Sequence, residues 1–227
     1  MLRLSHKVIA EGIGTFALVF FGCGAIMVME RFPGTLSPQI IPIVFGLVIS
    51  AMVYAVGHIS GAHFNPAVTL AFSLSRHFPK NQVLLYWLGQ VLGALFAILF
   101  LTYLLPQGVS YGATLPMIDP FKALLAEILL TFFLMFVITA VATDTRAVGT
   151  MAGAAIGITV MLCAFVAGPL TGASMNPARS LAPAIFEDQM TSLWIYLLGP
   201  MIGACLAAWV YEWIRCDADK KKAEGCC

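Results

Sequence analysis

The amino-acid sequence predicts an all-α membrane protein with six transmembrane helices and two half-helices in an inverted repeat. Three observations lead to this fold class: an apolar composition, six long hydrophobic stretches and one motif that occurs twice. Of the 227 residues, 60% are hydrophobic and 10% are charged, whereas a soluble domain carries about 25% charged residues. Because so little polar surface is available, the solvent of this chain must be lipid. A net charge of +1 gives no indication of nucleic-acid binding.

Six stretches approach the ~20 residues that a helix needs to cross a hydrocarbon layer of about 30 Å. They are residues 8–29, 40–56, 82–105, 121–142, 148–167 and 192–214. Two further apolar segments, 65–74 and 176–185, are too short to span. We therefore expect a single transmembrane domain over residues 1–227, with repeats at 8–105 and 121–214 and a short tail at 215–227.

The basic residues predict how the chain lies in a plasma or inner membrane. Nine of them fall on the side that holds both termini, and this side is expected to be cytoplasmic. They are Arg3, Lys7, Arg76, Lys80, Arg146, Arg215, Lys220, Lys221 and Lys222. Only Arg31 and Lys122 fall on the opposite side. The basic residues before the first stretch resemble a signal peptide, but that stretch is too long for a cleaved segment, so we expect it to be retained.

The two halves of the chain repeat each other. The sequence Gly57-x-x-Ser60-Gly61-Ala62-x-x-Asn65-Pro66-Ala67-x-Thr69 recurs 111 residues later as Gly168-x-x-Thr171-Gly172-Ala173-x-x-Asn176-Pro177-Ala178-x-Ser180. Each half holds three spans, an odd number, so the second half must enter the membrane from the opposite face. An inverted repeat is expected to place its functional site at the midplane, where interrupted helices meet.

The repeated Asn-Pro-Ala segments are typical of helix starts. Asn is a preferred N-cap, and Pro is favoured at the first helical position. Each Asn can cap its helix through the side-chain oxygen and keep its NH₂ group as a donor toward a lumen. Each helix start also carries a partial positive charge. Asn65, Pro66 and Ala67, together with Asn176, Pro177 and Ala178, therefore predict a polar passage that opposes cations and interrupts proton relay.

Arg179 directly follows the second motif, where the first repeat has Val68. A charge within lipid is costly, so it usually faces a cavity or a partner. A fold requirement would be expected in both halves, so we favour a pore-lining, selective role near the outer mouth over a buried salt bridge.

Glu11 and Glu127 are intramembrane acids at matching repeat positions. They could relay protons, but the symmetry favours a scaffold in which each carboxylate accepts hydrogen bonds from the non-helical backbone before Asn-Pro-Ala. His63 could line the vestibule on the side of the termini or bond to backbone, and both options stay open. The six cysteines have no adjacent His and no Cys-x-x-Cys spacing, so we expect neither a metal nor another cofactor.

On these motifs the chain resembles the major intrinsic protein family, the aquaporins and aquaglyceroporins. The most specific segments are Ser60-Gly61-Ala62-His63-Phe64-Asn65-Pro66-Ala67-Val68-Thr69 and Gly172-Ala173-Ser174-Met175-Asn176-Pro177-Ala178-Arg179-Ser180. The resemblance implies an hourglass fold, one pore per subunit and a homotetramer. It also implies a four-residue selectivity filter at Phe45, Ala164, Ala173 and Arg179.

The filter residues depart from the pattern of strict water channels, which typically have His where this chain has Ala164. The smaller side chain should widen the filter. Glycerol channels usually have Asp after the arginine, and this chain has Ser180 instead. The mixed pattern most resembles the nodulin-26-like branch and its bacterial relatives, which implies passage of water, glycerol and in some cases neutral metalloid hydroxides.

The expected function is passive transport of water and small uncharged solutes, with protons and ions excluded. A strict water channel is the first alternative. The second is a secondary transporter that couples protons through Glu11 or Glu127, since such proteins also use inverted repeats and broken helices. The chain has no Gly-x-Ser-x-Gly or His-Glu-x-x-His motif, so we do not expect an enzyme.

Overall fold

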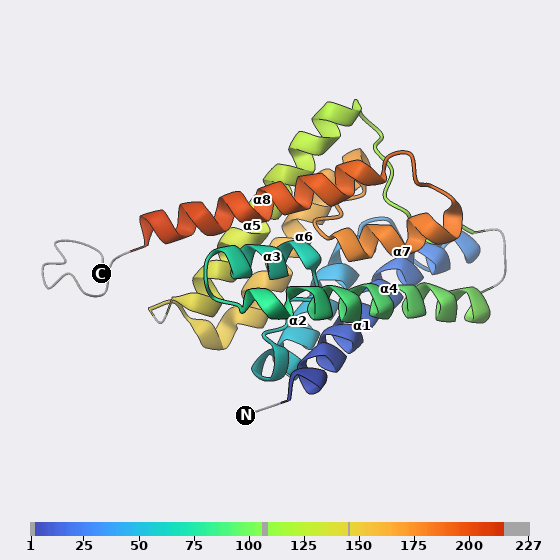
Figure 1. The fold of residues 1–227 in the computed structure, drawn as a ribbon. Coiled ribbons are helices and arrows are strands. Elements are labelled where there is room, and N and C mark those ends of the chain that lie inside the picture. The colour runs from blue at the N-terminus through green and yellow to red at the C-terminus, as the bar shows by residue number, and fades with distance from the viewer. Residues whose placement is uncertain (1–2, 106–108, 145, 216–227) are drawn as a thin grey trace, which may run out of the picture.

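The structure, a computed structural model, describes residues 3–105, 109–144 and 146–215. Within these residues, six long helices and two short ones make up the fold (Figure 1). The long helices are α1 (Leu4–Arg31), α2 (Ile40–Ser60), α4 (Val83–Leu104), α5 (Pro120–Thr143), α6 (Ala152–Thr171) and α8 (Leu193–Ile214). The half-helices are α3 (Pro66–Leu74) and α7 (Pro177–Glu187), and two single 3₁₀ turns, η1 (Lys80–Gln82) and η2 (Gly149–Met151), precede α4 and α6. The predicted tail lies, except for Arg215, outside the described residues.

The predicted fold class is confirmed: six helices of the described chain are long and apolar enough to cross a membrane. The predicted ends of two spans were too early. Helices α2 and α6 continue four residues beyond positions 56 and 167. Polar and small residues lower the hydropathy there, yet both helices continue through them, and α6 also includes Pro169. Both helices end where Gly61 and Gly172 adopt left-handed φ values of 93° and 80°, a conformation that glycine takes without steric cost.

The two halves pack in the same way and then join. Helix α1 lies along α4 in the first half, as α5 lies along α8 in the second, and α2 packs against α6 between the halves. Each half-helix packs mainly on the last helix of the other half, α3 on α8 and α7 on α4. The repeats therefore interlock, and α1 begins at the same end of the bundle at which α8 ends (Figure 1).

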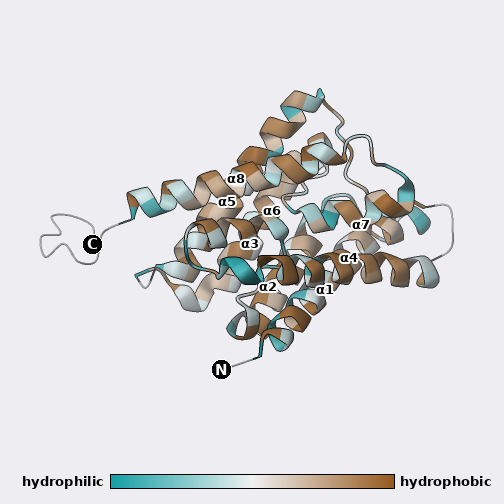
Figure 2. Cartoon of the chain, in the orientation of Figure 1, coloured by the Kyte–Doolittle hydropathy of each residue, from teal (hydrophilic) through white to brown (hydrophobic). Residues whose placement is uncertain are grey.

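The distribution of polarity suits a lipid environment. Hydrophobic residues cover the middle of the long helices, and hydrophilic residues gather at helix ends and connections (Figure 2). Many large apolar side chains point outward, among them Phe96, Phe133 and Val166, which are 58%, 52% and 72% exposed. In water such a surface would cause aggregation, whereas in a bilayer it meets acyl chains.

The contact between α2 and α6 depends on two matched glycines. A Cβ atom at Gly157 would overlap the Gly46 carbonyl oxygen and the Ser50 hydroxyl, and one at Gly46 would overlap the Gly157 carbonyl oxygen. We expect Gly157→Ala to destabilise the protein by about 1–3 kcal/mol, because the backbones must separate. Thermal unfolding in detergent measures the effect. Gly168→Ala is the matched control, since nothing lies within 4 Å of a Cβ there; equal losses from both variants would contradict the packing argument.

Candidate functional site

The half-helices begin at the two Asn-Pro-Ala segments, and each Asn caps its own helix. The Asn65 Oδ1 atom accepts from the Ala67 N–H at 2.9 Å. The Asn176 Oδ1 atom accepts from the Ala178 N–H at 3.0 Å. Proline occupies the first helical turn of both α3 and α7. Both side-chain oxygens are thus directed at their helices, which turns the NH₂ groups away from them.

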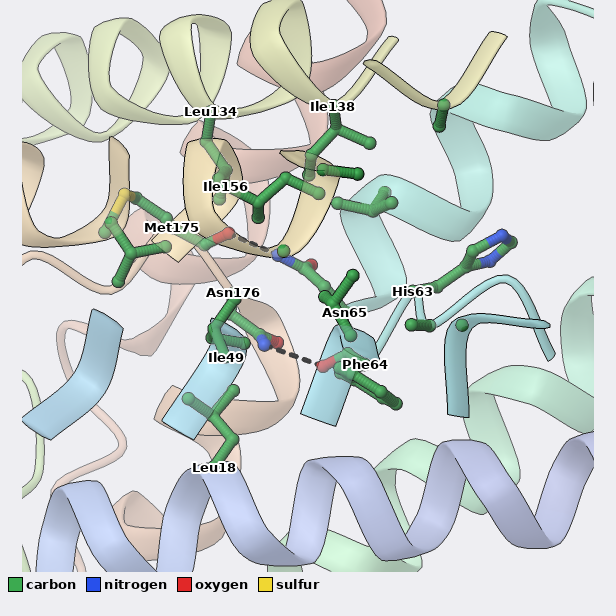
Figure 3. A pocket seen from close by; sticks show the side chains of 18 of the residues that line it. Leu18, Ile49, His63, Phe64, Asn65, Leu134, Ile138, Ile156, Met175 and Asn176 are labelled. Atoms are coloured by element: carbon green, nitrogen blue, oxygen red, sulfur yellow. Dashed lines mark hydrogen bonds between the residues drawn. The ribbon is translucent and has the colours of Figure 1, made fainter. Parts of the chain in front are cut away.

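Each Asn amide also bonds to the loop of the other repeat. The Asn65 Nδ2 atom donates to the Met175 carbonyl oxygen at 2.7 Å, and the Asn176 Nδ2 atom donates to the Phe64 carbonyl oxygen at 2.8 Å (Figure 3). The repeat pattern did not predict these bonds. Because an NH₂ group carries two hydrogens, one N–H of each Asn remains after the cross-repeat bond is made.

The loops before the half-helices have an unusual backbone. Ala62 and Phe64 have φ values of 50° each, and Ala173 and Met175 have values of 42° and 54°. Positive φ is uncommon for residues other than glycine and costs free energy. Such a conformation persists only where surrounding contacts hold it, so the partners of these loops matter.

Two buried carboxylates hold the loops. Glu11 accepts from the Ser60 hydroxyl at 2.7 Å and from the backbone N–H groups of His63 and Phe64 at 2.9 and 2.7 Å. Both Glu11 and Glu127 are 0% exposed. Neither carboxylate lines the cavity between the half-helices.

Glu127 repeats this pattern in the second half. It accepts from the Thr171 hydroxyl at 2.7 Å and from the N–H groups of Ser174 and Met175 at 2.9 and 2.8 Å. Two tyrosines complete the support, because Tyr86 and Tyr196 donate to the carbonyl oxygens of Ser60 and Thr171 at 2.8 Å each. The sequence contained a signal for these tyrosines, which match each other in the repeat, but no role was predicted for them.

One cavity joins the predicted site residues. Its volume is about 430 Å³, and both Asn65 and Asn176 line it. Along α2 its lining runs from Phe45 to His58, a distance of about 20 Å at 1.5 Å per residue. Aliphatic side chains form the remaining wall around the two amides (Figure 3). Those labelled in Figure 3 are Leu18, Ile49, Leu134, Ile138 and Ile156.

The four residues of the predicted filter also line this cavity. The Arg179 guanidinium lies over the Phe45 ring, with its carbon 5.2 Å from the ring centroid. The side chains of Ala164 and Ala173 are single methyl groups. Pro66, Ala67, Pro177 and Ala178 do not line the cavity, and all four are buried at the starts of the half-helices.

Arg179 obtains its polar partner from a connecting loop. Its Nη1 atom donates to the Gly112 carbonyl oxygen at 2.7 Å. Within the described part of the chain it forms no ion pair with a carboxylate. No residue between α4 and α5 was singled out from the sequence, so this contact was not predicted. Glu187 helps to place that loop by accepting from the Ala113 N–H at 3.0 Å.

His63 lines the cavity, and its ring lies to one side of the Asn65 and Asn176 amides (Figure 3). Its Nδ1 atom is 3.0 Å from the Thr69 hydroxyl oxygen. Gln90 bonds to both Glu11 and Thr69, at 2.8 and 2.9 Å. The sequence reasoning missed Gln90, and the repeat gave no signal for it, since Pro200 stands at the matching position of the second half. No group of His, Cys, Asp or Glu suited to a metal occurs among the described residues.

Fold and site together define a multi-pass membrane protein in which two inverted half-helices meet inside a cavity. The chain belongs to the major intrinsic protein family, whose sequence pattern matches residues 1–211. It is 49% identical to Aquaporin NIP1-1 of Zea mays over 211 residues, which cover 92% of this chain and 75% of that protein. It is 48% identical to Nodulin-26 of Glycine max over 211 residues, 92% and 78% of the two chains.

A solved structure has the same fold. The X-ray structure of the aquaglyceroporin from Plasmodium falciparum superposes with a TM-score of 0.84 at 22% identity, covering 93% of this chain and 97% of that one. The predicted resemblance to the nodulin-26-like branch is confirmed by the sequence relatives. The hourglass arrangement of helices is confirmed by the structural match.

Proposed function

We propose that this protein is a passive transmembrane channel for water and small uncharged solutes such as glycerol. The observation that carries the proposal is the single cavity lined by both Asn amides and by Arg179. A site for a folded macromolecule or a large ligand would need a wide opening. Here a cavity of about 430 Å³ that follows α2 for about 20 Å suits small molecules that pass along it.

The Asn amides supply the selectivity of the midplane. Each retains one N–H after its cross-repeat bond, so a passing water or hydroxyl oxygen can accept from both. Its own hydrogens then point toward the two mouths, and it cannot relay a proton onward. The positive ends of α3 and α7 oppose cations at the same point. These features support exclusion of protons and ions.

The filter residues support passage of glycerol as well as water. Ala164 and Ala173 leave room opposite Arg179 and Phe45, and the aliphatic wall can contact the carbon chain of a polyol whose hydroxyl groups bond to the amides. Names of the relatives include aquaporins and an aquaglyceroporin. Neutral metalloid hydroxides, being uncharged and hydroxylated, belong to the same proposed class of solute.

Passive flow is favoured over proton coupling by the environment of the two acids. Glu11 and Glu127 are fully buried outside the cavity lining, and donors occupy both oxygens of each carboxylate. A relay group needs contact with the solute path and a vacant position for its proton. We therefore assign both acids to the scaffold of the loops, and the family gives no indication of an enzyme.

Two further features complete the proposal. Both termini are placed in the cytoplasm because of the basic residues at their end of the bundle, including Lys7, Arg76 and Lys80. A homotetramer is proposed from the family resemblance, with lipid and identical subunits as partners. Cross-linking in native membranes would test the assembly, and labelling of single introduced cysteines from either side would test the orientation.

The function is tested by flux into proteoliposomes. Stopped-flow light scattering should show rapid entry of both water and glycerol, well above that of protein-free vesicles, with no accumulation of glycerol against its gradient when a proton gradient is imposed. Accumulation driven by protons would refute the channel. Water entry without glycerol entry would replace the proposal by a strict water channel.

Ala164→His tests the width argument. The imidazole should narrow the filter opposite Phe45 and add a polar wall. We therefore expect glycerol permeability to fall by roughly tenfold and water permeability to fall less than twofold. A difference in size of one or two carbon atoms changes the selectivity of a pocket by about that factor. Ala164→Val, which adds bulk without polarity, separates size from hydrogen bonding. Unchanged glycerol flux in the His variant would show that the filter lies elsewhere.

A further inference from the structure

We propose that Gln90, acting through Thr69, sets the tautomer of His63, so that the His63 Nε2 atom presents a hydrogen-bond acceptor to the cavity. The assignment of protons depends on the buried contacts alone. Its consequence for permeation rests on the proposed channel function.

Glu11 determines the orientation of the Gln90 amide. An ionised carboxylate acts only as an acceptor, and donors from Ser60, His63 and Phe64 bond to both oxygens of this one. The Gln90 amide, which is fully buried, must therefore turn its nitrogen toward Glu11, since the opposite orientation would place a carbonyl oxygen against a carboxylate. Of the two Nε2 hydrogens, one goes to Glu11 at 2.8 Å and the other to the Thr69 Oγ1 atom at 2.9 Å.

The Thr69 hydroxyl has one hydrogen and two acceptor positions. Its hydrogen is directed to the Asn65 carbonyl oxygen at 3.1 Å. Gln90 fills one acceptor position, and the remaining contact, at 3.0 Å, is with the His63 Nδ1 atom. All three contacts are hydrogen bonds only if Nδ1 carries a proton and donates it to Thr69. With Nδ1 unprotonated, the hydroxyl would have to abandon Asn65.

The imidazole is expected to be neutral. His63 is 8% exposed, and its ring centroid lies 5.0 Å from those of Phe72 and Phe78 and 5.2 Å from that of Tyr86. In the described chain no carboxylate pairs with it, and the positive end of α3 begins three residues later. A neutral ring with a proton on Nδ1 has an unprotonated Nε2. Among the described residues no group forms a hydrogen bond with Nε2, and His63 lines the cavity.

An acceptor at this position complements the Asn donors. Solute oxygens accept from the amides at the midplane, so their hydrogens point outward, and Nε2 can accept the outward hydrogen on the side of the termini. The second repeat has Ser174 at the matching position, and its hydroxyl is engaged with Ser180 and with the Asn176 carbonyl oxygen. The acceptor is therefore a feature of one half of the cavity only, which fits the presence of Gln90 in the first repeat alone.

Solid-state ¹⁵N NMR of the histidine-labelled protein in liposomes at neutral pH tests the proposal, because protonated and unprotonated ring nitrogens give well-separated signals. The His63 signals are identified by their loss in His63→Asn. We expect the Nδ1–H form to exceed the Nε2–H form by roughly tenfold, the excess that about one net buried hydrogen bond imposes. If most of the unmodified protein carried a proton on Nε2, as the other tautomer or as imidazolium, the proposal would be overturned without affecting the channel function.

Variants then test the route of the effect. Thr69→Val removes the acceptor for Nδ1 and should shift the population toward the Nε2–H form, whereas Thr69→Ser should retain the original form. The matched control is Thr139→Val. Thr139 is equally buried, but its hydroxyl bonds only to the Met135 carbonyl oxygen of its own helix. If Thr69→Val leaves the tautomer unchanged, the Thr69 contact does not set it and the proposed route is wrong. Water flux measured in parallel distinguishes this result from a failure of the channel.

Discussion

Arg179→Val should make the protein permeable to protons while raising glycerol flux. The replacement copies Val68 of the first repeat, so a half-helix of this kind tolerates it. A unit charge about 4 Å from a passing cation opposes it by about 4 kcal/mol at an effective dielectric constant near 20. Water in the cavity screens part of this barrier, and the positive ends of α3 and α7 still repel cations in the variant. We therefore expect proton leak to rise by roughly tenfold. Glycerol flux should also rise, since the largest side chain of the filter is shortened.

Proteoliposomes containing a pH-sensitive dye measure the leak, and light scattering of the same preparation measures glycerol entry. Arg31→Val is the control, because Arg31 is an exposed cation at the end of α1. If Arg179→Val leaked no more protons than the control, the exclusion of protons would depend on the two Asn amides and the helix ends alone. The selective role of Arg179 would then be wrong.

Glu127→Leu should prevent stable folding. The variant leaves the N–H groups of Ser174 and Met175 without an acceptor and leaves the Thr171 hydroxyl only the Ala167 carbonyl oxygen, at 3.4 Å. Each buried unsatisfied group costs about 1–3 kcal/mol, so two such groups cost about 2–6 kcal/mol, a large part of the 5–15 kcal/mol that typically separates folded from unfolded states. The strained Ala173 and Met175 would lose the contact that holds them. Glu127→Gln retains one acceptor oxygen and should be intermediate.

Fluorescence-detected size-exclusion after heating in detergent measures the fraction that stays folded. Glu212→Gln serves as the matched control for Glu127→Gln, because Glu212 lies at the end of α8 and is partly exposed in its pair with His77. A Glu127→Gln protein as stable as that control would contradict the scaffold role. If a stable Glu127→Gln protein also lost a solute uptake that the unmodified protein drives with a proton gradient, the transporter alternative would gain support.

Much of the site could be predicted because its signals are local or repeated. The apolar stretches predicted six spans, and capping by Asn65 and Asn176 follows from residue types one or two positions apart. The matched positions of Glu11 and Glu127 indicated a shared role. Gln90 was not predictable in this way, because the second repeat has Pro200 in its place and a glutamine within an apolar helix indicates no particular partner.

The sequence by itself determined the number of spans, the inversion of the two halves and the identity of the helix starts that meet between them. These depend on hydropathy over about 20 residues and on a pattern repeated along the chain. The tertiary structure decided the bonds from each Asn amide to the opposite loop, the contact of Arg179 with Gly112, and the contacts that link Glu11 to His63 through Gln90 and Thr69. Such hydrogen bonds join atoms far apart in sequence, 110 residues for Asn65 and Met175. They require distances near 3 Å and correct angles, which only the packed helices impose.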